Sequence, residues 1–154
     1  MTTPLSFLVA ISEVDAVAEV VIHTTLSLLA PPTESGSTHT LHLVHVVDVL
    51  PGASRAIQSS KQASAIALRT NGEAILERWA SMIEAERGVR PQVHLEFGPP
   101  GIRTVELATR LRPDLLVIGS LDKSMLARVA FGSNAEHVLT KAPCSVLLAR
   151  PRRA

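Results

Sequence analysis

Short, continuous apolar runs that alternate with longer stretches of helical periodicity constrain the fold of this chain most strongly. Leu5–Ile11 and Leu115–Ile118 are apolar at almost every position, whereas a strand with one solvated face alternates apolar and polar residues. Continuous apolar strands are typical of a parallel sheet that helices cover on both faces. The alternation of the two patterns therefore predicts an α/β fold.

Five strands and four helices are expected in a single domain of 154 residues that has no internal repeat. The strands are predicted at Leu5–Ile11, Thr40–Val47, Gln92–Phe97, Leu115–Ile118 and Ser145–Ala149. The helices are predicted from Glu13 to just before Pro31, and at Gln62–Arg87, Ile102–Leu111 and Ser133–Thr140. One doubly wound parallel sheet accommodates this order of elements.

Local signals predict where these elements begin and end. Ser12 is a suitable N-cap for the first helix, and Gly88 is a suitable stop for the long one. Loops are expected at Pro31–Ser37, at Val49–Lys61 and from Ser120 onward. The apolar stripe of the first helix is predicted to comprise Val14, Val17, Ala18, Val21, Ile22, Leu28 and Leu29.

The overall composition argues against several classes of partner. Fifteen Lys and Arg residues against fourteen Asp and Glu residues leave a net charge of +1, so no global field attracts nucleic acid or an anionic membrane. Aromatic residues make up 3% of the chain and tyrosine is absent, which argues against a stacking platform for single-stranded nucleic acid. The apolar runs are far shorter than the roughly 20 residues that span a bilayer.

The histidines and the single cysteine predict neither a metal centre nor a nucleophile. His39, His42 and His45 lie along one predicted strand, where alternate side chains point to opposite faces. His42 is therefore expected to face away from the other two. Cys144 is expected to be an apolar filler, and one cysteine cannot form an intramolecular disulfide. A reducing, cytoplasmic compartment is expected for such a chain.

Glycine and polar residues gather where the predicted strands end. Ligands of open parallel sheets bind beyond the carboxyl ends of the strands, which here are Ala10–Ser12, Val46–Asp48 and the residues from Ile118 and Gly119 onward. Gly132-Ser133-Asn134 opens the last helix and offers backbone N–H groups and a hydroxyl to a phosphate. A glycine before a helix is equally a plain cap, so both interpretations stay open at this point.

The spacing of four residues near the C-terminus resembles a known pattern. Gly119, Asp122, Gly132 and Ser133 occupy the positions of Gly-x2-Gly-x9-Gly-(Ser/Thr), the hallmark of the universal stress protein family. The segments 113–120 and 142–148 also resemble that family, as do Phe7–Ile11 and Leu43–Val47. The resemblance implies a five-stranded, adenine nucleotide alpha hydrolase-like sheet in the order 3-2-1-4-5. It further implies dimerisation and two branches, one of which binds ATP or AMP.

The resemblance also implies a set of nucleotide contacts. Ser12 occupies the position of an aspartate that binds the ribose in the family, and Val46 that of a residue whose backbone meets the adenine. Phosphate contacts are implied for Gly119, Gly132 and Ser133. The full set of predicted cofactor-binding residues is Ala10, Ser12, Val46, Ile118, Gly119, Asp122, Gly132, Ser133, Asn134 and Ala135.

Asp122 departs from the family pattern, which has glycine at that position. A carboxylate about 4 Å from a phosphate costs roughly 1–4 kcal/mol, and a residue with a Cβ atom resists positive φ. Lys123 and Arg128 are candidates to offset this repulsion. In the alternative interpretation, Asp122 turns outward or holds Mg²⁺.

Three functions remain as hypotheses. The first is a non-enzymatic regulatory domain of the stress response, dimeric through the last strand, with weak or lost adenine-nucleotide binding. The second is a competent ATP- or AMP-binding member with little or no hydrolysis. The third is an enzyme of a related family that forms adenylates, but such sites usually require a His-x-Gly-His-type signature that this sequence lacks.

Overall fold

The computed structural model describes residues 3–29, 39–48, 61–120 and 132–151. Within them, five strands pair in parallel into one sheet in the order β3-β2-β1-β4-β5. The strands are β1 (Ser6–Ala10), β2 (Thr40–Val47), β3 (Gln92–Phe97), β4 (Leu115–Gly119) and β5 (Ser145–Ala149). The predicted fold class and strand order are therefore confirmed. The loops predicted at Pro31–Ser37, over 49–60 and after Ser120 lie outside the described residues.

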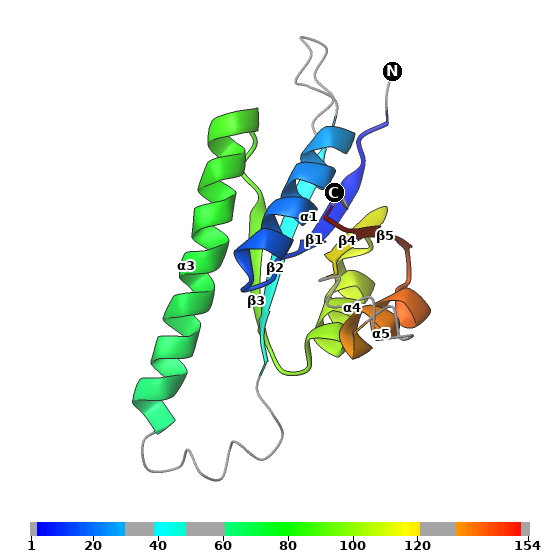
Figure 1. Cartoon of the computed structure of the whole chain (residues 1–154). Coiled ribbons are helices and arrows are strands. Elements are labelled where there is room, and N and C mark those ends of the chain that lie inside the picture. The colour runs from blue at the N-terminus through cyan, green and yellow to red at the C-terminus, as the bar shows by residue number, and fades with distance from the viewer. Residues whose placement is uncertain (1–2, 30–38, 49–60, 121–131, 152–154) are drawn as a thin grey trace.

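Four helices of the described chain flank this sheet (Figure 1). They are α1 (Asp15–Leu28), α3 (Lys61–Arg87), α4 (Pro100–Leu111) and α5 (Ser133–Lys141). The first two share one hydrophobic core with the sheet, and the last two share another. Each of the first four strands is followed by a helix that returns the chain to the same edge, which is the arrangement that parallel strands require.

The core between the sheet and α1 and α3 is the larger of the two. Leu76, Trp79 and Ile83 of α3 are buried there. A Cβ atom at Gly119 would lie 2.7 Å from Cγ2 of Val21 and would also overlap Val17. Glycine at the end of β4 thus lets α1 pack directly against the strand, because any larger residue would push the helix away.

The opposite core lies between the sheet and α4 and α5. It is built from Leu8, Val44, Leu107, Ala108, Leu116, Ile118 and Val138. A Cβ atom at Gly101 would lie 2.9 Å from the carbonyl oxygen of Asn134. The first turns of α4 and α5 therefore contact each other backbone to backbone, at the carboxyl edge of the sheet.

Two local predictions about α1 are wrong. Val14, not Ser12, is its N-cap, and the Ser12 hydroxyl instead accepts a hydrogen bond from the Val14 N–H at 3.1 Å. The chain continues extended past β1, because the Ile11 N–H still donates to the Val44 carbonyl. Val14 and Leu28 are exposed at the two ends of the helix, where the sheet no longer covers the stripe. Leu26 and Thr25 are buried instead.

The other helix boundaries agree with the sequence to within two residues. The helix α4 begins at Pro100 rather than Ile102, because proline fits the first turn, where its missing N–H is not needed. Gly88 follows α3 with a φ of 68°, as expected for a glycine that ends a helix. None of the described helices is long and apolar enough to cross a membrane.

Candidate functional site

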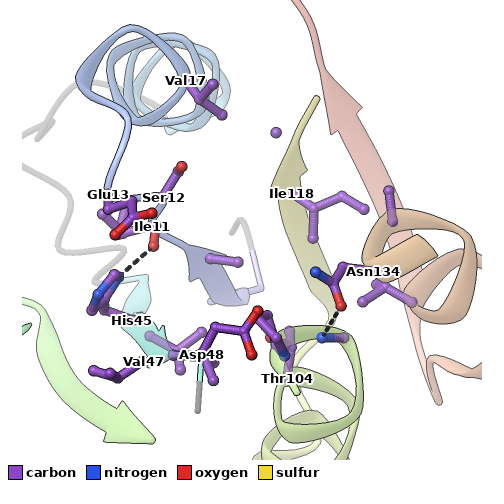
Figure 2. A pocket seen from close by; sticks show the side chains of 18 of the residues that line it. Ile11, Ser12, Glu13, Val17, His45, Val47, Asp48, Thr104, Ile118 and Asn134 are labelled. Atoms are coloured by element: carbon purple, nitrogen blue, oxygen red, sulfur yellow. Dashed lines mark hydrogen bonds between the residues drawn. The ribbon is translucent and has the colours of Figure 1, made fainter. Parts of the chain in front are cut away.

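A cavity of about 490 Å³ opens at the carboxyl edge of the sheet (Figure 2). Its walls are the ends of β1, β2 and β4, the first turns of α4 and α5, and two residues of α3, Leu68 and Asn71. This is the place where parallel α/β sheets bind ligands, because the strand ends and the following helix N-termini converge there.

Most of the residues predicted for the nucleotide site meet in this cavity. Its lining includes Ala10, Ser12, Val46, Ile118, Gly119, Asn134 and Ala135. Gly132 and Ser133 are the N-cap and the first residue of α5, directly before Asn134. The prediction that the last helix begins at Ser133 is confirmed. Asp122 lies outside the described residues, and its role stays a prediction from the sequence.

Two polar side chains of the predicted set already form hydrogen bonds inside the protein. The Ser12 hydroxyl oxygen accepts from the Val14 N–H, as described above. The side-chain carbonyl oxygen of Asn134 accepts from the Gly101 N–H at 3.1 Å. This bond joins the first turn of α5 to that of α4 and is drawn in Figure 2. Asn134 retains its amide N–H groups as donors, which is the polarity that a phosphate requires.

His45 lines the cavity although the sequence did not assign it to the site. Its ring nitrogen Nδ1 donates to the carbonyl oxygen of Ile11 at 2.9 Å. Because a carbonyl oxygen can only accept, Nδ1 carries a proton in this bond. The bond joins the end of β2 to the residue directly after β1, so His45 holds together two strand ends that line the cavity.

Two carboxylates that the sequence also did not assign lie at the cavity. Glu13 follows β1, Asp48 follows β2, and both side chains are exposed. In Figure 2, Glu13 and Asn134 stand on opposite sides of the cavity. Their charge disfavours a phosphate nearby, but carboxylate oxygens accept hydrogen bonds from hydroxyl groups such as those of a ribose. Their position directly after a predicted strand is the sequence signal that could have identified them as site residues.

Thr104, in the second turn of α4, is the most deeply buried polar side chain of the cavity lining. It is 4% exposed, and its hydroxyl forms no hydrogen bond with any described residue. No pattern in the sequence marks Thr104 as a site residue, because a lone threonine on the inner side of an amphipathic helix is indistinguishable from a core residue.

The histidines form no metal centre within the described ranges. His42 lies against His94 of β3, with Nδ1 of the former 3.1 Å from Nε2 of the latter, while His45 points to the opposite face beside Gly72 of α3. The predicted alternation along β2 is thus confirmed. The described residues contain no group of three or more His, Cys, Asp or Glu side chains that could hold a metal ion.

Cys144 packs against the core beneath α4 and α5. Burial raises the pKa of its thiol, so the side chain is a neutral thiol at pH 7 rather than a reactive thiolate. This agrees with the prediction that Cys144 is an apolar filler.

Comparisons with known proteins agree with the resemblance that the sequence showed. Residues 33–150 match the model of the universal stress protein family. A universal stress protein of Methanocaldococcus jannaschii is 32% identical over 110 residues, which cover 71% of this chain and 64% of that protein's length. The chain thus matches just under two thirds of this relative.

Solved structures share the fold. The universal stress protein UspA from Lactobacillus plantarum superposes with a TM-score of 0.76 at 19% identity, over 97% of this chain and 100% of the other. A universal stress protein family member from Arabidopsis thaliana with AMP bound gives a TM-score of 0.67 at 19% identity, over 97% and 93% of the two chains.

Proposed function

We propose that this chain, which belongs to the universal stress protein family, is a regulatory domain that binds an adenine nucleotide weakly in the cavity at the carboxyl edge of its sheet. One observation carries the proposal. Residues from β1, β2, β4 and α5 that the family resemblance assigned to nucleotide contacts line a single cavity. The AMP bound to the Arabidopsis relative supports the same class of ligand.

The cavity suits the parts of an adenine nucleotide. Val46 would meet the adenine through its backbone, and Val44 and Ile118 add apolar walls for the base. The first turn of α5 directs backbone N–H groups and the positive end of the helix dipole to the phosphate. A Cβ atom at Gly132 would meet no atom of the described residues within 4 Å, so none of these residues blocks the approach to Gly132.

Two features support weak rather than tight binding. A carboxylate at the Ser12 position would offer two charged acceptor oxygens to the ribose, whereas the Ser12 hydroxyl oxygen already accepts from the Val14 N–H. The sequence also has Asp122 where the family has glycine beside the phosphates, and like charges repel.

We further propose that the domain is not an enzyme and acts as a cytoplasmic homodimer. The strand β5 supports a dimer, because it is one of the two edge strands and pairs only with β4 among the described strands. An uncovered strand edge favours pairing with a second copy. Light scattering at micromolar concentration is expected to report twice the mass of one chain, and a monomer would contradict the dimer.

A second candidate function is competent ATP or AMP binding with little or no hydrolysis. The carboxylate of Glu13, which directly follows Ser12 and lines the cavity, favours it, because this group can accept from the ribose hydroxyls in place of the missing aspartate. In this version Asp122 would hold a Mg²⁺ ion, which would supply positive charge to offset the repulsion between the carboxylate and the phosphates.

Calorimetric titration of AMP and ATP, with and without Mg²⁺, separates the two candidates. Weak binding predicts that Asp122→Gly tightens the affinity about 5- to 150-fold, which corresponds to roughly 1–3 kcal/mol. Competent binding predicts tight binding by the wild type and a loss of affinity in Asp122→Gly. Phosphate release from ATP, followed in parallel, is expected to stay at the background rate.

The variant Gly132→Leu tests the proposed position of the nucleotide's phosphate. Gly132 has a φ of −63° that any residue adopts, and a Cβ atom there meets none of the residues that the structure describes within 4 Å. The variant is therefore expected to fold like the wild type and to lose nucleotide binding, because the side chain fills the space in front of the α5 N–H groups. Unchanged binding would contradict the proposed position of the phosphate.

A further inference from the structure

Thr104 stands out when the buried helical threonines of this protein are compared. Thr25 of α1 is 1% exposed, and its hydroxyl donates to the Val21 carbonyl at 2.8 Å, one turn earlier in the same helix. The hydroxyl of Thr109 makes the same bond to Val105 within α4 itself, although Thr109 is exposed. Bonding to the preceding turn is thus a ready way to satisfy a helical threonine.

Thr104 does not use that solution. It is 4% exposed, and the described residues provide no hydrogen bond to its hydroxyl, although the Pro100 carbonyl lies one turn earlier in α4. Among the described residues, the fully buried side-chain atoms without a partner are Trp79 Nε1 and Arg103 Nε, so the Thr104 oxygen keeps some exposure to solvent. A molecule that covers this oxygen has to replace water as its hydrogen-bond partner. The side chain lines the cavity (Figure 2), so a bound molecule is the natural source of that partner.

The surroundings of Thr104 indicate what kind of molecule this is. Val44, Val46, Ile118 and Val138 line the same cavity with aliphatic side chains, whereas Asp48 and Asn134 line it with polar ones. A hydroxyl in a cavity with aliphatic walls suits a flat heteroaromatic ring, which packs its faces on the aliphatic groups and needs a hydrogen bond at its edge. A phosphate or a ribose would instead need several donors or acceptors together.

We propose that the Thr104 hydroxyl forms a hydrogen bond with the edge of the bound base and thereby selects bases with a polar atom at that place. The inference rests on the proposed nucleotide site and adds a specificity-determining side chain to it. A hydroxyl can both donate and accept, so it accommodates an amino or an oxo substituent. It disfavours a base that presents only carbon there, because the hydroxyl would then stay buried without a partner.

The experiment compares three proteins and two ligands by NMR titration, which measures weak binding as well as tight binding. Thr104→Val removes the hydroxyl and keeps the shape, and Thr104→Ser keeps the hydroxyl. We expect Thr104→Val to bind AMP about 3- to 10-fold more weakly than the wild type, as for the loss of one hydrogen bond. Thr104→Ser should bind nearly as well as the wild type. Ribose 5-phosphate, which has no base, should bind the three proteins equally.

Thr25→Val is the matched control, since it removes an equally buried hydroxyl far from the cavity lining. It should lower the melting temperature, because its hydroxyl has a partner, and should leave AMP affinity unchanged. Thr104→Val should not lower the melting temperature of the ligand-free protein, because no hydrogen bond is lost there.

The outcomes separate the inference from the proposed function. If the wild type binds AMP and Thr104→Val binds it equally well or better, the assigned role of Thr104 is wrong while the nucleotide site stands. Equal weakening of AMP and ribose 5-phosphate binding would also overturn it, because the effect would not come from the base. If the wild type binds no AMP at millimolar concentration, both proposals fail.

Discussion

On the face of the sheet covered by α1 and α3, sixteen buried apolar residues of the described chain form one core, whereas the face covered by α4 and α5 has a core of seven. The two faces also differ in what their helices contact. The helix α1 lies directly on β4 at Gly119, while α4 and α5 make their closest approach to each other, at Gly101 and Asn134.

The difference indicates that the two faces of the sheet contribute differently to stability and to ligand binding. Burial of apolar surface is the main source of stability, so the larger core contributes most of it. The smaller core positions two helix N-termini at the cavity, and Val44, Ile118 and Val138 belong both to that core and to the cavity lining. Of the larger core, only Ile11 and Val17 line the cavity among the described residues. Changes in the larger core away from these two residues should therefore act on folding, and changes in the smaller core should also act on binding.

Leu76→Ala should produce the largest effect, a loss of about 2–5 kcal/mol in the free energy of unfolding, because it leaves a void in the larger core. Leu107→Ala is the matched variant in the smaller core, since both leucines are 2% exposed. Urea denaturation measures the loss of stability, and titration with AMP measures the affinity of the folded variants. If Leu76→Ala weakened binding more than Leu107→Ala, the two faces would not divide their roles as described.

Gly119→Ala should have the second largest effect, a loss of about 1–3 kcal/mol in the free energy of unfolding, because the added atom overpacks the core. The added Cβ atom would meet Val17 and Val21, which are buried side chains of α1. Thermal unfolding checks this. Gly132→Ala, where the added atom meets nothing within 4 Å, is the control and should unfold at nearly the wild-type temperature.

Gly101→Ala should destabilise the protein less, by about 1 kcal/mol, and should act more clearly on binding. The new Cβ atom would lie 2.9 Å from the Asn134 carbonyl oxygen, so α4 and α5 must separate and the bond from the Gly101 N–H to the Asn134 side chain lengthens. Titration of AMP should show a weaker affinity. An unchanged affinity with the same loss of stability would mean that the spacing of the two helices does not matter to the ligand.

The smallest expected effect is a pH dependence of the free energy of unfolding. It comes from two histidines, His42 and His94, on the face of the sheet that α4 covers. Burial lowers the pKa of both His42 and His94 below the ordinary value near 6.5, and their proximity adds to the effect at His42. For His94, Glu96 opposes the shift and Arg110 of α4 supports it. The folded protein therefore takes up fewer protons than the unfolded chain in mild acid.

The sign follows from this difference in proton uptake. This contribution to stability is fully present above the unfolded pKa near 6.5 and is lost as the pH falls through that value towards the lower pKa of the folded state. Urea denaturation at several pH values measures the loss. A double variant, His42→Gln with His94→Gln, should show a flatter profile over that range, and a profile as steep as that of the wild type would exclude the pair as its cause.

The sequence predicted the elements well where a repeating local pattern sets them. The strands Thr40–Val47, Gln92–Phe97 and Ser145–Ala149 have the predicted bounds, because apolar runs between breakers depend on nearby residues alone. The N-cap of α1 was predicted wrongly at Ser12, since the bond from Ile11 to Val44 of another strand keeps the chain extended there. Such a pairing is not visible in a local pattern.

For the candidate site, the sequence by itself determined which strand ends meet, because parallel strands bring their carboxyl ends to one edge and the family pattern marks residues there. Only the tertiary structure decided which other side chains join them. His45, Thr104 and Gly101 enter the site through the register of β2 against β1 and the packing of α4 against α5. The physical reason is that a side chain's partner depends on contacts between residues far apart in the chain, such as His45 with Ile11, which no spacing along one segment encodes.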